Sequence, residues 1–268
     1  MSAQPKYTHT LKGARAIIFG GSSGIGEAVA EALIEEGASV LISSSKQQKL
    51  DQVVARLGDP SQVYNADPSR IAGAVADLSD GPTAEAALEA LFSKSLPPSW
   101  QGKVDHIIFT AGDRLWNKPL EEHSYADILQ AGQVRFFAPL LVAKIAVKYW
   151  AQNGTLTLTA GIVARQPRYQ WSVINSFATG LEGMTRGLAL DLAATNDLRV
   201  RVNCVHPGPV LTPIWNEFPE EMRKAVIEKT EKDCLVKFFP GPECIAHTYS
   251  KSRCKDEIRS LELTRVRS

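Results

Sequence analysis

The chain has 268 residues, of which 44% are hydrophobic and 22% are charged, a composition typical of a globular protein and not of a disordered one. Thirty basic side chains against 29 acidic ones leave a net charge of +1, which gives no indication of a nucleic-acid partner or a membrane surface. We see no signal-peptide pattern and no apolar run near the roughly 20 residues of a membrane span. We therefore predict a cytoplasmic protein with one domain over residues 1–268.

Short apolar runs alternate with segments of helical period along the chain. The apolar runs predict strands over residues 15–20, 38–45, 71–80, 104–112, 154–161 and 198–210. The helical period predicts helices over residues 27–38, 46–58, 83–95, 125–150 and 176–194. Strands that alternate with helices are typical of an α/β protein, so we predict a single doubly wound Rossmann-type domain with a parallel sheet and helices on both faces.

A glycine motif lies between the first predicted strand and the first predicted helix. Gly20, Gly24 and Gly26 give the pattern G-x-x-x-G-x-G. Glycine permits the tight turn, lets the backbone approach a pyrophosphate and leaves the helix N-terminus facing the phosphates. The strand–turn–helix context favours a dinucleotide site over an ordinary glycine-rich turn.

The end of the second predicted strand discriminates between NAD(H) and NADP(H). An acidic residue there would bind the ribose hydroxyls and repel a 2′-phosphate. This chain instead has Ser43, Ser44, Ser45 and Lys46. Hydroxyl groups and a cation suit a phosphate, so we predict NADP(H), against the alternative of an ordinary polar strand end.

The cysteines do not indicate a metal site. They are Cys204, Cys234, Cys244 and Cys254. None belongs to a C-x-x-C pair, and His206 and His247 do not complete a metal-binding spacing. We predict reduced thiols and no metal.

The motifs resemble, in their order, those of the short-chain dehydrogenase/reductase family, from about Gly13 to about Thr212. The glycine loop is similar to the family's cofactor loop, and TAG at 110–112 is similar to its NAG motif. LEGMTRGLALDLA resembles its sixth helix, and RVNCVHPGPVLTP resembles its PG motif. The resemblance implies a cofactor site formed by Gly20, Ser22, Ser23, Gly24, Ile25, Gly26, Ser44, Ser45, Lys46, Asp77, Leu78, Ala111, Gly112, Pro207, Gly208, Val210 and Thr212.

The family's catalytic residues have no counterpart here. The positions of its Asn, Ser, Tyr and Lys fall on Gly132, Gly161, Ile174 and Ala178. The nearby Tyr169 does not replace the pair, because the residue four positions later is Val173. Carbonyl reduction therefore lacks its usual proton donor. Hydride transfer itself is the cofactor's chemistry, and an iminium accepts hydride without a proton.

Three remaining side chains are candidate catalytic residues: Asp113, Arg135 and Trp171. Asp113 follows the TAG motif, and Arg135 lies about one helical turn after Gly132. The alternatives are a cap of the next segment for Asp113, a surface or ion-pair residue for Arg135, and a core or interface position for Trp171. We expect Arg135 and Asp113 to orient the substrate and Trp171 to form an apolar wall.

A fungal subgroup of the family fits these features. It has lost the catalytic tetrad and comprises NADPH-dependent reductases and intramolecular Diels–Alderases of prenylated indole alkaloid biosynthesis. FTAGD, VRFFAPLLVAK, TGLEGMTRGLA and the missing Tyr and Lys are similar to that subgroup. Asp113 and Arg135 match its pocket residues and Trp171 its loop tryptophan. The loop aspartate of the subgroup has no counterpart between Thr159 and Asn175.

The resemblance implies a biosynthetic enzyme that holds NADP(H) beside a bulky hydrophobic substrate and promotes Diels–Alder cyclisation, iminium reduction or both. One alternative is a carbonyl reductase with a relocated acid, Tyr169 or Asp113. Another is a non-catalytic NADP-binding sensor. The two long helices offer a surface for a homo-oligomer.

The C-terminus departs from the family pattern. PECIAH at 242–247 resembles the start of the family's last helix. The residues after it lack the usual glycine-rich final strand, and LELTRV has the weak alternation of an edge strand.

Overall fold

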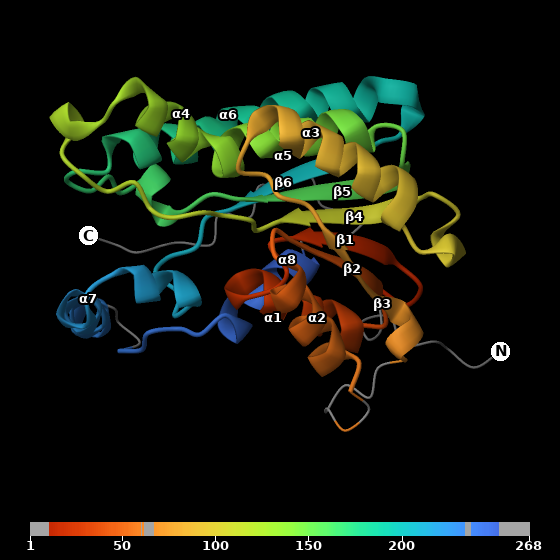
Figure 1. The fold of residues 1–268 in the computed structure, drawn as a ribbon, viewed down its shortest axis with the longest axis horizontal. Helices are drawn as coiled ribbons and strands as arrows, with labels where there is room; N and C mark the ends of the chain where they lie inside the picture. Colours follow the sequence, from red (N-terminus) through yellow and green to blue (C-terminus); the bar gives the residue numbers. More distant parts are fainter. Residues whose placement is uncertain (1–10, 60, 62–66, 234–236, 252–268) are drawn as a thin grey trace.

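A computed structural model describes residues 11–59, 61, 67–233 and 237–251. One parallel sheet runs through it in the order β3-β2-β1-β4-β5-β6 (Figure 1). Its strands are β1 (Arg15–Phe19), β2 (Ser39–Ser44), β3 (Ile71–Val75), β4 (Val104–Phe109), β5 (Trp150–Thr159) and β6 (Arg201–Val205). Each strand overlaps a predicted one, which confirms the doubly wound α/β fold.

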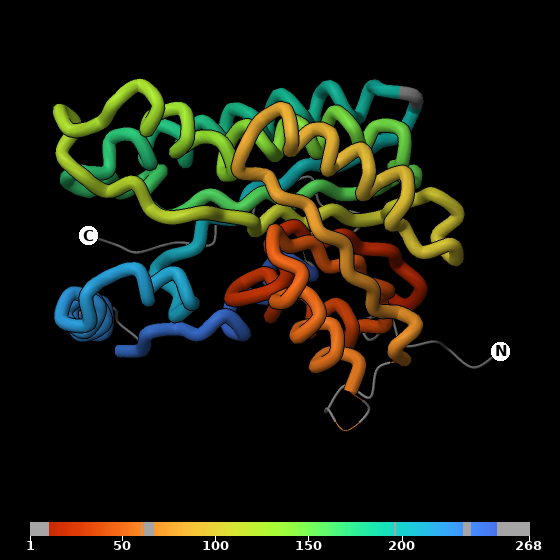
Figure 2. Tube along the Cα trace, viewed as in Figure 1, coloured from red at the N-terminus to blue at the C-terminus, as the bar shows by residue number. Residues whose placement is uncertain are grey.

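Helices cover both faces of the sheet, as predicted. They are α1 (Gly24–Glu35), α2 (Gln47–Leu57), α3 (Gly81–Ala90), α4 (Tyr125–Gly132), α5 (Ala138–Ala146), α6 (Ser172–Ala194), α7 (Glu220–Asp233) and α8 (Glu243–Lys251). In Figure 1 α1, α2 and α8 lie on one side of the sheet, and α3, α4, α5 and α6 on the other. Figure 2 shows α8 beside α1, although the two are far apart in sequence.

Alternating side chains of each strand build two hydrophobic cores. Ile17 and Phe19 of β1 join the core under α3, α5 and α6, whereas Ile18 joins the core under α1 and α2. Tyr249 of α8 is fully buried in the second core, and its hydroxyl lies 2.8 Å from Thr159 Oγ1 at the end of β5. The last described helix is therefore part of the fold and holds the carboxyl end of a central strand.

The helix predicted over 125–150 is shorter than the sequence pattern indicates. A π-helical turn, Gln133–Phe137, joins α4 to α5, and the helix ends at Ala146. Trp150 instead opens β5 and pairs with Val104 of β4, because its buried side chain belongs to the core beneath the sheet. Apolar period alone does not show where a buried helix gives way to a buried strand.

By length and composition, the segment Tyr125–Ala146 is apolar enough to cross a membrane. Its most apolar window is 44% buried inside the molecule, and it contacts α3, α6 and β5. A helix that covers a sheet has the same composition, so this segment is weak evidence for a membrane span.

Other differences lie at the ends of elements. Helix α6 begins at Ser172, four residues before the predicted start, and α7 was not predicted. Helix α8 confirms the helix expected at PECIAH.

Cys204 and Cys244 are free thiols. Cys234, Cys254 and the strand expected at LELTRV lie outside the described residues.

Candidate active site

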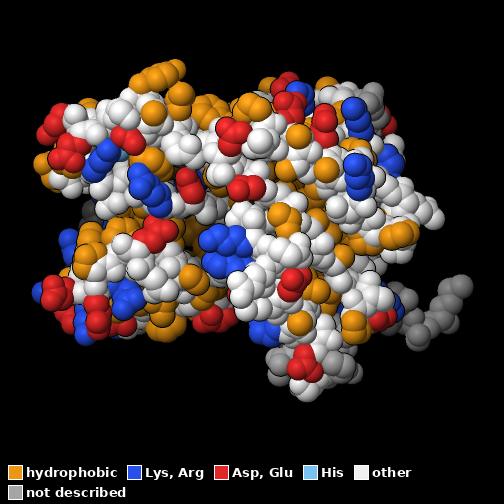
Figure 3. Space-filling model, viewed as in Figure 1, with side chains coloured by type: hydrophobic (Ala, Val, Ile, Leu, Met, Phe, Trp, Pro, Cys, Tyr) orange, Lys and Arg blue, Asp and Glu red, His pale blue; other side chains and the backbone are white. Residues whose placement is uncertain are grey.

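A cavity of about 680 Å³ opens at the carboxyl edge of the sheet, lined by the loops after β1, β2, β4, β5 and β6 and by the start of α6. Strand β1 lies between β2 and β4 in the sheet. The chain first adds β2 and β3 on one side of β1 and then adds β4, β5 and β6 on its other side. Such a switch point is where doubly wound sheets form a crevice. Figure 3 shows the surface hollowed there, with hydrophobic side chains inside.

The glycine loop brings three pieces of backbone unusually close together. Gly20 has φ +79°, and a Cβ there would lie 2.6 Å from the Ala111 backbone. A Cβ on Gly26 would overlap the Gly20 carbonyl oxygen and the Thr110 hydroxyl. Thr110 holds this arrangement, because its backbone N–H and its hydroxyl each donate to the Phe19 carbonyl at 2.9 Å. Only glycine fits at these two positions, for steric reasons.

The start of α1 is built to receive an anion. Ser23 is its N-cap but makes no side-chain capping bond, so the first N–H groups of the helix keep their donor capacity. Ser23, Gly24 and Ile25 line the cavity. Uncapped N–H groups and the helix dipole favour a phosphate at this position, so the loop fits the pyrophosphate of a dinucleotide.

A hydroxyl-rich and basic surface follows β2. Ser22 Oγ and Ser44 Oγ lie 2.8 Å apart, and Ser44 Oγ also accepts from the Lys46 N–H at 3.4 Å. Lys46 and Lys49 both line the cavity. Sequence analysis missed Lys49, although its position one helical turn after Lys46 was a usable signal.

The structure places every predicted cofactor residue and every candidate catalytic residue on the lining of this one cavity. They are Gly20, Ser22, Ser23, Gly24, Ile25, Gly26, Ser44, Ser45, Lys46, Asp77, Leu78, Ala111, Gly112, Asp113, Arg135, Trp171, Pro207, Gly208, Val210 and Thr212. The predicted positions are therefore brought together, whereas what they bind stays a prediction.

Three of the four positions that correspond to the family's tetrad line the cavity as well: Gly161, Ile174 and Ala178. Ile174 and Ala178 lie one turn apart on α6 and share one face. Their side chains make this part of the cavity wall apolar.

The fourth position, Gly132, is filled by a neighbour. A Cβ on Gly132 would lie 2.6 Å from the Phe177 ring, which also lines the cavity. Phe177 packs against Phe136 and Phe137 with ring centroids 5.3 Å and 5.9 Å away. Sequence analysis missed Phe177, although its spacing from Ile174 puts both on one face of α6.

Asp113 and Arg135 form an ion pair in the cavity lining; the sequence left an ion pair open as an alternative for Arg135 but did not identify Asp113 as its partner. Arg135 Nε lies 3.3 Å from Asp113 Oδ1, and Arg135 also donates to the Asp113 carbonyl. Their side chains are 23% and 29% exposed, respectively. Burial raises the pKa of Asp113 despite the attraction of Arg135, and burial lowers the pKa of Arg135.

Glycine at position 112 is needed for this pair. The Arg135 guanidinium lies against Gly112, where a Cβ would be only 2.6 Å from Nη1. Arg135 itself lies in the π-helical turn between α4 and α5. Such turns often occur at functional sites, because they redirect side chains that a regular helix would present elsewhere.

The loop before α6 contributes Trp171 and Arg168 to the cavity, but not Tyr169. The Tyr169 side chain is 87% exposed. It does not line the cavity, which argues against Tyr169 as a relocated acid. Trp116 and Trp215 also line the cavity and were missed, because an isolated tryptophan in a loop carries no sequence signal.

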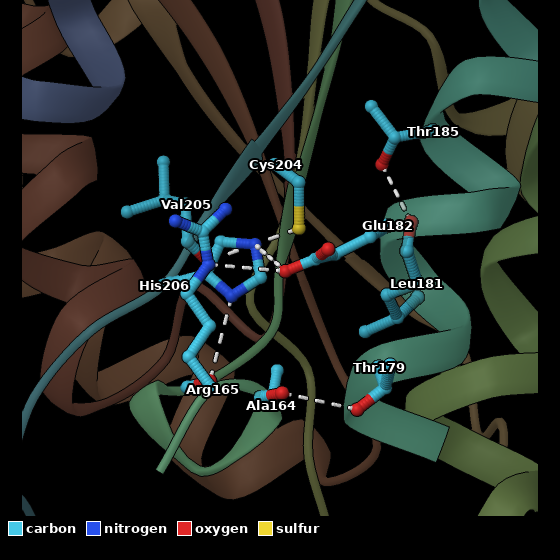
Figure 4. A network of polar contacts seen from close by, with 10 residues as sticks. Ala164, Arg165, Thr179, Leu181, Glu182, Thr185, Cys204, Val205 and His206 are labelled. Atoms are coloured by element: carbon cyan, nitrogen blue, oxygen red, sulfur yellow. Dashed lines mark hydrogen bonds and ion pairs between the residues drawn. The ribbon is translucent and has the colours of Figure 1, made fainter. Parts of the chain in front are cut away.

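A polar network supports the wall from behind (Figure 4). His206 Nδ1 lies 3.4 Å from the Gly161 carbonyl, and Nε2 lies 3.6 Å from Glu182 Oε1, which also binds Arg165 Nε at 3.2 Å. A neutral imidazole has one N–H and donates to only one of these oxygens, whereas an imidazolium donates to both. The neighbouring Cys204 is inert as a nucleophile, because burial raises the pKa of its thiol to about 11.

Comparison with known proteins places this geometry in a family. The model of the SDR-like Rossmann domain matches residues 7–234. The chain belongs to the short-chain dehydrogenase/reductase family. It is therefore related to oxidoreductases, and its fold implies a nicotinamide cofactor.

Fungal members are among its relatives. Short-chain dehydrogenase/reductase fsr5 of Gibberella fujikuroi is 41% identical over 223 residues, covering 82% of this chain and 80% of the relative. Short-chain dehydrogenase/reductase malC of Malbranchea aurantiaca is 36% identical over 242 residues, covering 89% and 88%. A solved structure of the MalC reductase/Diels–Alderase from that organism superposes with a TM-score of 0.81 at 34% identity, covering 93% of each chain.

The close packing at Gly26 leads to a first prediction. Gly26→Ala should weaken nicotinamide dinucleotide binding by at least about tenfold, because its methyl group displaces the Gly20 carbonyl or the Thr110 hydroxyl from the phosphate loop. Calorimetric titration measures the affinity. The matched control is Gly183→Ala on α6, where a Cβ meets nothing within 4 Å. Equal affinity of both variants would contradict the prediction.

The ion pair leads to a second prediction. Arg135→Met leaves the partly buried Asp113 carboxyl without its cation, so the pKa of Asp113 in the folded state rises further above the unfolded value. A raised carboxyl pKa stabilises the folded state at low pH, and this contribution is lost as pH rises through the folded pKa. The free energy of unfolding of Arg135→Met should fall by about 1–2 kcal/mol between about pH 4 and pH 8.

The control for that measurement is the double variant Asp113→Asn/Arg135→Met, which has no carboxyl to titrate. Urea unfolding of both variants across the same pH range isolates the contribution of Asp113. Parallel pH profiles would show that the pKa of Asp113 in Arg135→Met is the same in the folded and unfolded states, and would contradict the prediction.

Proposed function

We propose that the protein is an NADP(H)-dependent reductase or cyclase of fungal-type secondary metabolism that holds a bulky, largely apolar substrate beside the nicotinamide. The observation that carries the proposal is the combination of a complete dinucleotide cradle with Gly161, Ile174 and Ala178 where the family's proton donors stand. The likeness to the MalC reductase/Diels–Alderase supports the same class of reaction.

NADPH, when bound, supplies a hydride. The protein's own residues then have to position the substrate and exclude water, because Ile174 and Ala178, at the predicted Tyr and Lys positions, have no proton to deliver. An iminium carbon that accepts hydride becomes a neutral amine and needs no proton. An intramolecular cycloaddition needs none either, and both reactions gain from orientation in an apolar cavity.

Asp113 and Arg135 form a charged pair in the cavity lining that is suited to orient the substrate. A paired carboxylate and guanidinium present a strong local dipole in a poorly hydrated wall. Such a dipole can bind an amide or stabilise charge that develops in a transition state. Trp171 provides an apolar surface on the opposite loop.

The rival functions are less well supported. A carbonyl reductase with a relocated acid needs a proton donor in the cavity. Tyr169 does not line the cavity, whereas Asp113 does and has a pKa raised by burial, so this alternative rests on Asp113 alone. A non-catalytic sensor needs no substrate space, whereas this cavity extends well past the dinucleotide loop to α6. A homo-oligomer through the long helices stays a prediction.

The cofactor preference is tested at Lys46. We expect NADPH to bind more tightly than NADH, because the serines and Lys46 at the end of β2 suit the 2′-phosphate. Lys46→Ala should weaken NADPH binding by about tenfold and leave NADH binding nearly unchanged, since a charge-assisted contact contributes about 1.5–3 kcal/mol. Calorimetric titration with both dinucleotides measures this, and tighter binding of NADH by the unaltered protein would refute it.

The reaction class is tested with two substrates of the same bicyclic shape. N-methyl-3,4-dihydroisoquinolinium is a permanent iminium, and 1-tetralone is a ketone that needs a proton. We expect NADPH oxidation, followed by absorbance, with the iminium and negligible oxidation with the ketone. Comparable turnover of both would favour a relocated acid. Hydride transfer to neither compound, with NADPH bound, would overturn the reductase part of the proposal.

A further inference from the structure

Two arginine–tryptophan pairs line the cavity on different loops. The Arg114 guanidinium carbon lies 3.7 Å from the centroid of the Trp116 ring, in the segment after β4. The Arg168 guanidinium carbon lies 5.5 Å from the centroid of Trp171, just before α6. All four side chains belong to the cavity lining, and both arginines are exposed.

Neither arginine has a carboxylate partner among the residues that the structure describes. The cavity lining contains two carboxylates, Asp113 and Asp77. Asp113 is paired with Arg135, and Asp77 accepts the Ser79 N–H at 3.0 Å in the loop after β3. The positive charge of Arg114 and Arg168 is therefore uncompensated within the cavity.

The indole contacts prepare these guanidinium groups for a planar anion: Arg114 lies over the Trp116 ring, and Arg168 lies within cation–π range of Trp171. A guanidinium held against an indole face keeps its N–H groups free around its edge, and it loses less conformational entropy on binding than a mobile side chain would. Its fork of donors matches the two oxygens of a carboxylate. The indole rings beside the arginines offer apolar surface to the ring that bears such a group.

We propose that the substrate is a ring-bearing organic acid whose carboxylate is bound by Arg114 and Arg168, with its planar ring against Trp116 and Trp171. This deepens the proposed function and rests on it for the position of the reacting carbon, which lies beside Ile174 and Ala178. The carboxylate of the substrate and its reacting carbon then contact different walls of the cavity. Arg135 is engaged by Asp113 and is not the anion-binding arginine.

The test uses a probe acid and its neutral amide of the same shape. Calorimetry measures the binding of 2-naphthoate and 2-naphthamide to the protein saturated with NADP⁺. We expect 2-naphthoate to bind about tenfold more tightly, as a charge-assisted bidentate contact on an exposed surface provides. Arg114→Gln and Arg168→Gln should each reduce this ratio several-fold, and the double variant should abolish it.

Two further variants separate geometry from charge. Arg186→Gln removes the same charge from an exposed site on α6 outside the cavity lining, and should leave the ratio unchanged. Arg114→Lys with Arg168→Lys keeps the charge but loses the planar fork, and should restore only part of the preference.

Equal binding of acid and amide, binding of neither, or a preference that survives the double Gln variant would each overturn the inference. Binding of NADP⁺ is titrated separately in every variant. A protein that binds NADP⁺ but not the acid refutes this inference alone, whereas failure to bind NADP⁺ refutes the proposed function.

Discussion

The site depends on the close contact between the turn after β1 and the end of β4. Gly20, Gly26 and Thr110 meet there without room for a further carbon atom, and Thr110 is bound to the Phe19 carbonyl. This contact sets the start of α1 at the switch point of the sheet, with its first N–H groups facing the cavity. Ala111, Gly112 and Asp113 follow Thr110 directly at the end of β4. The same contact therefore also fixes their position in the cavity.

The residues predicted to stand at the family's proton-donor positions make the cavity wall apolar, while the surrounding fold is kept. Ile174 and Ala178 keep the helix face and the spacing of the missing Tyr and Lys, and His206 with Glu182 holds the Gly161 turn from behind. Phe177 occupies the space beside Gly132, so the fourth position is closed by an aromatic ring. A wall of this kind can shape and orient a substrate, but it cannot donate a proton to it.

The sequence predicted the fold and the phosphate loop from local pattern, whereas cavity residues such as Asp77 and Pro207 were predicted from the resemblance to the family. Strand–helix alternation and the glycine loop are visible in a single segment, and the parallel sheet brings the strand ends to one edge. The pairing of Asp113 with Arg135 was not predictable, since it depends on the π-helical turn in a segment whose pattern indicates one long helix. Phe177, Trp116 and Trp215 were missed because their roles depend on packing between distant segments.

The charges of the cavity are divided by environment. The Arg135 side chain is partly shielded from solvent, where an unpaired guanidinium would be costly, and its pairing with Asp113 compensates its charge. Arg114 and Arg168 are exposed, and their indole neighbours leave the N–H groups free. An arginine that is deeply placed therefore acts as part of a dipole, whereas one at an exposed position keeps its full charge for an incoming group. The position of each arginine, more than its presence, decides which chemistry it can serve.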